Sequence, residues 1–190
     1  MFSDLLAELN FIYIFLASFL FIAGIYTAPF LVEKETGWLL AYPRWVGRLT
    51  KKYIERDHHF TALFIVIVIL NNLSLFSGFL SGYLIVLPFL LCFFTGFNVA
   101  VLGYDLLGWQ GIWHMLVNPV AWLEFPAAWL SFAMGFRLAV AVAENGFTAG
   151  VLEFQLLLPL YLKYVFTLLI IAGILESLLI FFARRHQDHD

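Results

Sequence analysis

Residues 118–139 read NPVAWLEFPAAWLSFAMGFRLA, and this stretch decides how the rest of the chain is interpreted. It is long and apolar enough to cross a membrane, yet it contains Glu124, Arg137 and two prolines. A charged side chain at the centre of a bilayer costs at least about 2.5 kcal/mol on insertion scales, so it is rarely without a role. The stretch therefore predicts a membrane helix that carries buried polar groups.

The composition extends this prediction to the whole chain of 190 residues, of which 63% are hydrophobic and 12% charged. The mean hydropathy is +0.94, whereas soluble domains are about half apolar and about a quarter charged. No linker or change in composition divides the chain, so we expect one multi-pass domain of the cell membrane over residues 1–190. The lone Cys92 excludes an intramolecular disulfide and a cysteine-based metal site.

We expect an all-α protein with about five transmembrane helices, because a spanning helix needs about 20 mostly apolar residues. The candidate spans are residues 9–32, 60–82, 84–104, 120–143 and 157–183. The first is interpreted as a retained span and not a signal peptide, because Met1 to Asn10 lack basic residues. The short turn at residues 81–83 predicts a tight antiparallel hairpin.

The start of the fourth span has two interpretations. Asn118 could cap a helix that has Pro119 at its first position. Alternatively, residues 109–124 form a broken or re-entrant segment and the helix begins near Pro126. The second interpretation places Glu124 at a helix N-terminus, where the helix dipole favours an anion.

The basic residues predict the orientation, because cytoplasmic loops of membrane proteins are enriched in Lys and Arg. The N-terminus and residues 144–153 have none, whereas Arg184 and Arg185 follow the last span. We therefore expect the N-terminus outside and the C-terminus inside. The loop after the first span holds the remaining cluster: Lys34, Arg44, Arg48, Lys51, Lys52 and Arg56.

Within this loop, residues 43–58 are predicted to form a cytoplasmic amphipathic helix. Pro43 suits a first helical turn, and Trp45, Leu49 and Tyr53 then recur every four residues. Such a helix either offers a docking surface for acidic lipid or a protein partner, or acts only as a topology anchor.

Polar residues inside the spans form the candidate functional site. A helical rise of about 1.5 Å per residue places Asn98, Glu124 and Glu176 at similar depth in the inner half of the membrane. Two close carboxylates could share a proton, so the cluster is either a proton or cation relay, a capture site for a basic partner residue, or a structural network. Interhelical hydrogen bonding is predicted for Asn71 and Asn72.

Arg137 lies on a different face from Glu124 and nearer the outer surface. We expect it to snorkel towards the outer surface or to pair with Glu144, seven residues further along the helix.

Two stripes of small residues predict close helix packing, although they do not say whether the partner helix belongs to this chain. They recur at intervals of four, a spacing that places them on one helix face. The stripes are Ala127, Ser131, Gly135, Ala139 and Ala143 in the fourth span, and Ser74, Gly78 and Gly82 in the second.

The pattern of residues does not point to an enzyme. No phosphate-binding glycine loop, Ser-His-Asp arrangement or zinc-protease spacing occurs. His58, His59, His186 and His189 neighbour aspartates, but adjacent histidines do not face one way on a helix. We expect no cofactor, metal or nucleic acid, and partners that are membrane lipids, other membrane proteins or further copies of the chain.

The order of polar residues resembles the stage II sporulation protein M family of integral membrane proteins. The family's second span often has an Asn pair, here Asn71-Asn72, and its third ends in a Gly- and Asn-rich stretch, here residues 96–103. Its fourth span has a Pro-x-x-x-x-Glu stretch, then Pro-Ala and Gly-x-Arg. Here these read Pro119 to Glu124, Pro126-Ala127 and Gly135-Phe136-Arg137, while Glu176 matches a glutamate of the last span.

The chain departs from the family pattern at Val120 and Ala121, where relatives have His and Gly. Some relatives also place the loop after the first span outside, in conflict with the basic loop here. The resemblance implies a membrane scaffold like the namesake, which serves cell-wall hydrolases during spore formation. The expected function is therefore a non-enzymatic scaffold or accessory subunit. The alternative is a transporter or channel component that conducts an ion, proton or small solute through the polar cluster.

Overall fold

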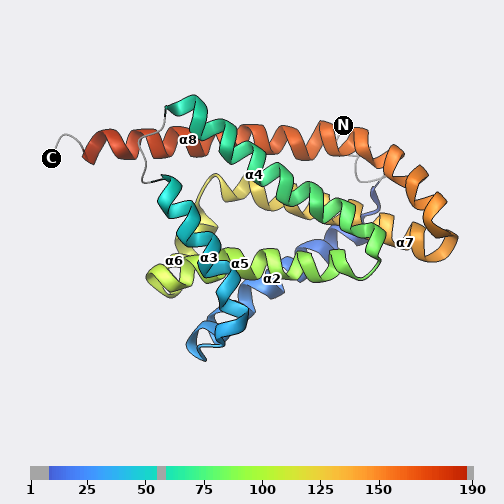
Figure 1. The fold of residues 1–190 in the computed structure, drawn as a ribbon, viewed down its shortest axis with the longest axis horizontal. Helices are drawn as coiled ribbons and strands as arrows, with labels where there is room; N and C mark the ends of the chain where they lie inside the picture. The colour runs from blue at the N-terminus through green and yellow to red at the C-terminus, as the bar shows by residue number, and fades with distance from the viewer. Residues whose placement is uncertain (1–8, 55–58, 188–190) are drawn as a thin grey trace.

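The computed structural model describes residues 9–54 and 59–187, with side chains described for residues 9–49 and 59–183. The regular structure in these ranges is entirely helical, which confirms the predicted all-α class. Figure 1 shows an elongated bundle with the shorter helices at one end. In chain order the elements are α2 (Phe11–Glu33), α3 (Gly37–Ile54), α4 (Phe60–Leu80), the 3-10 turn η1 (Ser81–Leu84), α5 (Leu87–Leu107), α6 (Trp109–Val117), α7 (Ala121–Leu160), the π-helical η2 (Tyr161–Phe166) and α8 (Thr167–Gln187).

Within the described ranges, four segments are long and apolar enough to cross a membrane: Phe11–Glu33, Phe60–Leu84, Leu87–Leu107 and Ala121–Ala183. The last has 63 residues and turns back on itself at Gly146, so its two arms run side by side (Figure 1). The loop expected at residues 144–153 is thus helical apart from this break. Gly146 adopts φ 82°, a left-handed conformation that glycine accepts without steric cost.

α2 and α5 form the most extensive helix pair, because two glycines let their backbones touch. A Cβ atom on Gly24 would collide with the carbonyl oxygen of Phe93, and one on Gly96 with the carbonyl oxygen of Phe21. The Sγ of Cys92 lies 3.2 Å from the carbonyl oxygen of Ala17 in the same interface. This crossing anchors the first span to the third.

The predicted stripes of small residues pack against each other inside this chain, except that Ser74 is exposed on another side of α4. A Cβ on Gly82 would collide with the carbonyl oxygen of Gly135, and one on Gly135 would lie 2.9 Å from the carbonyl oxygen of Gly78. Ser131 donates a hydrogen bond of 2.6 Å to the carbonyl oxygen of Leu75. Ala127 and Ala139 are buried along this α4–α7 seam, whereas Ala143 near the Gly146 break is exposed.

The expected tight hairpin of α4 and α5 is wrong, although the connecting turn is as short as predicted. α4 and α5 hardly touch beyond η1, because α4 packs on α7 and α5 packs on α2. The ring of Phe132, from α7, lines the space between α4 and α5. A Cβ on Gly78 would come within 2.7 Å of that ring. The two helices therefore diverge and leave a groove.

α3 is the predicted amphipathic helix, but it begins earlier than expected. The carbonyl oxygen of Thr36 accepts the N–H groups of Leu39 and Leu40, so the helix starts at Gly37 and Pro43 lies inside it. Its described apolar face, Trp38, Tyr42, Trp45 and Leu49, is exposed. Residues 55–58 of the predicted segment and the side chains of Lys51, Lys52 and Tyr53 lie outside the described part.

Exposed tryptophans gather at the end of the molecule that carries α3 and α6. Trp109 and Trp113 on α6 and Trp122 at the start of α7 are exposed there, together with Trp38 and Trp45 of α3. Tryptophan is enriched at membrane–water interfaces, where its ring lies at headgroup level. Exposed tryptophans at one end of a helical bundle are typical of a membrane interface.

The start of α7 lies between the two interpretations of the sequence, because the chain breaks between α6 and α7 but the break is short. The nine-residue helix α6 ends at Val117. The side-chain Oδ1 of Asn118 then accepts a hydrogen bond of 3.0 Å from the backbone N–H of Val120. Pro119 precedes α7 instead of occupying its first position. α7 begins at Ala121, not near Pro126, and its first turn contains Glu124.

Candidate functional site

The centre of the site is a hydrogen bond between two membrane helices. Asn71 on α4 donates its Nδ2 proton to Oε1 of Glu124 at 2.6 Å. Glu124 sits in the first turn of α7, where the unpaired backbone N–H groups and the helix dipole favour a carboxylate. Glu176 of α8 lies within electrostatic range of Glu124. The structure therefore brings two carboxyl groups and one amide together from three helices.

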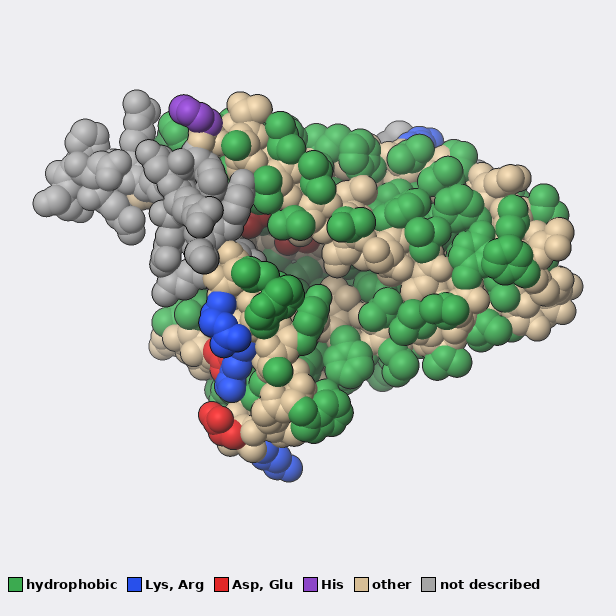
Figure 2. All heavy atoms as spheres, in the orientation of Figure 1, with side chains coloured by type: hydrophobic (Ala, Val, Ile, Leu, Met, Phe, Trp, Pro, Cys, Tyr) green, Lys and Arg blue, Asp and Glu red, His purple; other side chains and the backbone are tan. Residues whose placement is uncertain are grey.

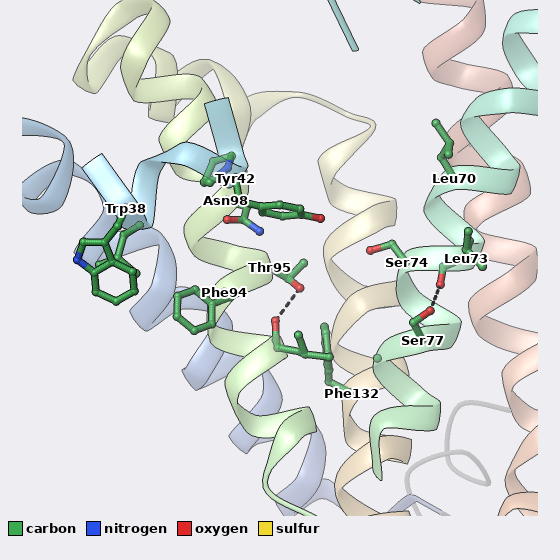
Figure 3. A pocket seen from close by; sticks show the side chains of 14 residues that line it. Trp38, Tyr42, Leu70, Leu73, Ser74, Ser77, Phe94, Thr95, Asn98 and Phe132 are labelled. Carbon is green, nitrogen blue, oxygen red and sulfur yellow. Dashed lines mark hydrogen bonds between the residues drawn. The ribbon is translucent and has the colours of Figure 1, made fainter. Parts of the chain in front are cut away.

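Asn98 was expected in this cluster, and that expectation is wrong. It points into the groove between α4 and α5, next to Tyr42 of α3 (Figure 3). Counting residues along a helix gives the depth of a side chain, but not the rotation of the helix about its axis. α5 turns its glycine face to α2, and this rotation points Asn98 into the groove beside α3.

Asn72 makes a second interhelical contact of its own. The hydroxyl of Tyr161 in η2 lies 3.1 Å from Oδ1 of Asn72 and 3.3 Å from its carbonyl oxygen. The ring of Tyr161 stacks on Phe79 at a centroid distance of 5.7 Å. The sequence predicted that Asn72 forms an interhelical hydrogen bond, but it did not identify Tyr161 as the partner. The feature of the sequence that could have identified Tyr161 is a tyrosine hydroxyl inside an otherwise apolar segment.

Arg137 pairs across the fold with Glu153, on the other side of the Gly146 break. Arg137 and Glu153 line an open cavity of about 430 Å³. Glu144, the partner that the sequence predicted for Arg137, lines this cavity too, together with Asn10 and Asn145. The sequence placed Glu153 in a loop, so this ion pair was missed. It closes the hairpin between the two arms of the last apolar segment.

A further ion pair fixes α3 to the end of α5. Nε and Nη2 of Arg44 donate to the two carboxylate oxygens of Asp105 at 2.8 and 2.9 Å. The hydrogen bond to Asp105 raises the pKa of Arg44 above its ordinary value, so the arginine stays charged. A bidentate ion pair of this kind sets the orientation of α3 as well as its position.

The groove between α4 and α5, here called the α4–α5 groove, has a volume of about 620 Å³. Its walls are Leu70, Leu73, Ser74 and Ser77 of α4 and Leu91, Phe94, Thr95 and Asn98 of α5, and Trp38 and Tyr42 of α3 lie at its end. Figure 3 shows Phe94, Thr95 and Asn98 on one side of the opening and Ser74 and Ser77 on the other, with Phe132 between the two walls. Its lining contains no charged residue.

No group of three or more His, Cys, Asp or Glu side chains that could hold a metal occurs within residues 9–54 and 59–187. His59 is exposed, while the side chains of His58, His186 and His189 lie outside the described part.

Long apolar helices, exposed tryptophans at one end and a carboxyl group hydrogen-bonded between two helices define the class as helical multi-pass membrane proteins. The family model described as stage II sporulation protein M matches residues 12–179. The chain therefore belongs to the stage II sporulation protein M family, which confirms the resemblance seen in the sequence. No curated protein and no solved structure matches the chain significantly.

Proposed function

We propose that this protein is a non-enzymatic scaffold or accessory subunit of a membrane complex, and that α2 is its docking helix. Exposed apolar side chains follow one face of α2 along its whole length. They recur every three or four residues, and each is 46–65% exposed: Phe11, Phe15, Phe19, Ile22, Tyr26 and Phe30.

This face is the observation that carries the proposal. The opposite face of α2 is occupied by α5, so the aromatic face is available to another helix. Spacing of three and four residues is how a helix presents anchors to a helical partner, and aromatic anchors dominate interface energetics. The small-residue stripes do not serve this purpose, because α4 and α7 already use them on each other.

The proposal includes the orientation of the protein in the cell membrane. Five crossings follow if the two arms of Ala121–Ala183 each cross once, since about 20 helical residues span a bilayer. The basic residues Arg44 and Arg48 favour a cytoplasmic position for α3 and the tryptophan-rich end, because cytoplasmic loops are enriched in Lys and Arg. Figure 2 shows most of the visible Lys and Arg side chains at this end, while the long flanks are apolar.

Site-specific photo-crosslinking tests the docking helix. A benzophenone amino acid replaces Phe19 in the native membrane, and the control replaces Ile171, an equally apolar exposed residue of α8. We expect a protein adduct of one defined mass at Phe19 and lipid adducts alone at Ile171. Lipid adducts alone at both positions would contradict the scaffold proposal.

The hydrogen-bonded acid of the site favours a second candidate, a component that moves a proton or cation. Glu124 and Glu176 are acids of two helices that lie within electrostatic range of each other in apolar segments, and such acids mark ion or proton paths in many membrane proteins. Glu124→Gln keeps a carbonyl acceptor for Asn71, so the fold should survive while any relay stops. Proton or cation flux into liposomes that is present in the wild type and lost in this variant supports transport. Equal flux in both excludes Glu124 from the path.

A further inference from the structure

We propose that the α4–α5 groove binds one acyl chain of an anionic glycerophospholipid, whose headgroup lies against α3. The proposal goes beyond the scaffold function and does not depend on it. The groove has a volume of about 620 Å³, within the range of about 300–1,000 Å³ that is typical of small-molecule sites. Figure 2 shows the surface hollowed beside α3.

The position of α3 selects a lipid over a helix as the occupant. α3 leaves the α2–α5 pair and leads towards the start of α4 (Figure 1), and Trp38, Tyr42 and Pro43 line the end of the groove. A transmembrane helix in the groove would have to continue through α3 to reach the interface. A lipid can end there, because its headgroup belongs at the level of these interfacial aromatics.

The polar groups of the groove fit the glycerol and ester region of such a lipid. The hydroxyls of Ser77 and Thr95 are bonded at 2.7 Å to carbonyl oxygens of their own helices. Within the described residues, the side chains of Asn98 and Ser74 make no hydrogen bond. An amide without a partner at membrane depth is costly. Asn98, which lies beside Tyr42 in Figure 3, can donate to an ester carbonyl. Leu70, Leu73 and Leu91 line the path of the acyl chain.

Charge selects the headgroup. The sequence of α3, Gly37–Ile54, contains Arg44, Arg48, Lys51 and Lys52 and no acidic residue. Arg44 is bound to Asp105, whereas Arg48 is exposed. A basic segment at headgroup level attracts anionic lipid, and the uncharged groove beneath it suits an acyl chain. The expected ligand is therefore a phospholipid such as phosphatidylglycerol and not a zwitterionic one.

The test uses phosphatidylglycerol with a photoactivatable diazirine on one acyl chain, in bilayers that contain the purified full-length protein. We expect crosslinks on the groove walls of α4 and α5, and about tenfold fewer of them in Ser74→Phe, which fills the groove. The matched control is Ile69→Phe, at an exposed position of α4 that does not line the groove. It should crosslink like the wild type.

Two further arms define the headgroup and the occupant. The same diazirine chain on phosphatidylcholine should give about tenfold fewer groove crosslinks, and Arg48→Gln should reduce this preference. Equal labelling by both lipids, or equal labelling of Ser74→Phe and Ile69→Phe, would overturn the proposal and indicate bulk lipid. Crosslinks between two copies of the chain through the groove would show a protein occupant and overturn it as well.

Discussion

α4 meets its two neighbours in opposite ways, and the difference shows what small residues achieve in a membrane. Towards α7, Gly78 and Gly82 bring the backbones into contact, and Ser131 adds a hydrogen bond across the seam. Towards α5, Ser74 and Ser77 are also small, yet no helix packs against them and a groove remains. Small residues permit close packing, but a seam closes only where the partner helix also offers a small face.

The largest effect is expected at the α2–α5 crossing. Gly96→Leu places a side chain where the backbone of Phe21 lies, and neither helix can yield without losing the contact. We expect a loss of about 3 kcal/mol or more in the free energy of unfolding, measured by denaturant titration in detergent. Gly37→Leu is the control, because its Cβ meets nothing within 4 Å. Equal stability of the two variants would contradict the close crossing.

A smaller loss in the free energy of unfolding is expected for a substitution at the α4–α7 seam. Gly135→Leu intrudes on the carbonyl oxygens of Gly78 and Phe79 and should destabilise the protein by about 1–3 kcal/mol. Because this seam is internal to the chain, the effect should not depend on protein concentration. A concentration-dependent loss would mean that the stripe also holds copies of the chain together.

The smallest effect sharpens the comparison between seam and groove. Ser131→Ala removes the hydrogen bond to Leu75 and should cost about 0.6 kcal/mol, the average for interhelical hydrogen bonds in membranes. Ser77→Ala removes only a bond to Leu73 on its own helix, so its unfolding free energy should match the wild type. A larger loss for Ser77 than for Ser131 would show that the groove wall contributes more to stability than the seam.

The sequence predicted the depth of the polar residues better than it predicted which of them meet in the site. Glu124 and Glu176 share a depth because the helical rise is fixed, and the structure places them in electrostatic range. Asn98 has a similar depth but faces the groove, and Asn71 takes its place beside Glu124. Rotation about the helix axis decides such cases, and packing against a neighbouring helix sets that rotation.

Pairing across the fold was equally beyond the sequence. Glu144 and Glu153 line the same cavity as Arg137, and the break at Gly146 brings Glu153 into an ion pair with Arg137. In the same way, the two small-residue stripes were visible in the sequence, but only their contact shows that each is the other's partner. The exposed aromatic face of α2 became visible once α5 was seen to cover the opposite face.

By itself, the sequence determined that this chain is a helical membrane protein of the stage II sporulation protein M family, because apolar length, charge placement and the order of polar residues are local properties. The tertiary structure alone decided which helices touch, which polar groups meet and where a groove remains. Those outcomes depend on how each helix is rotated and tilted against its neighbours. Rotation and tilt follow from backbone contacts at a few glycines, such as Gly24 and Gly96, that lie far apart in the chain.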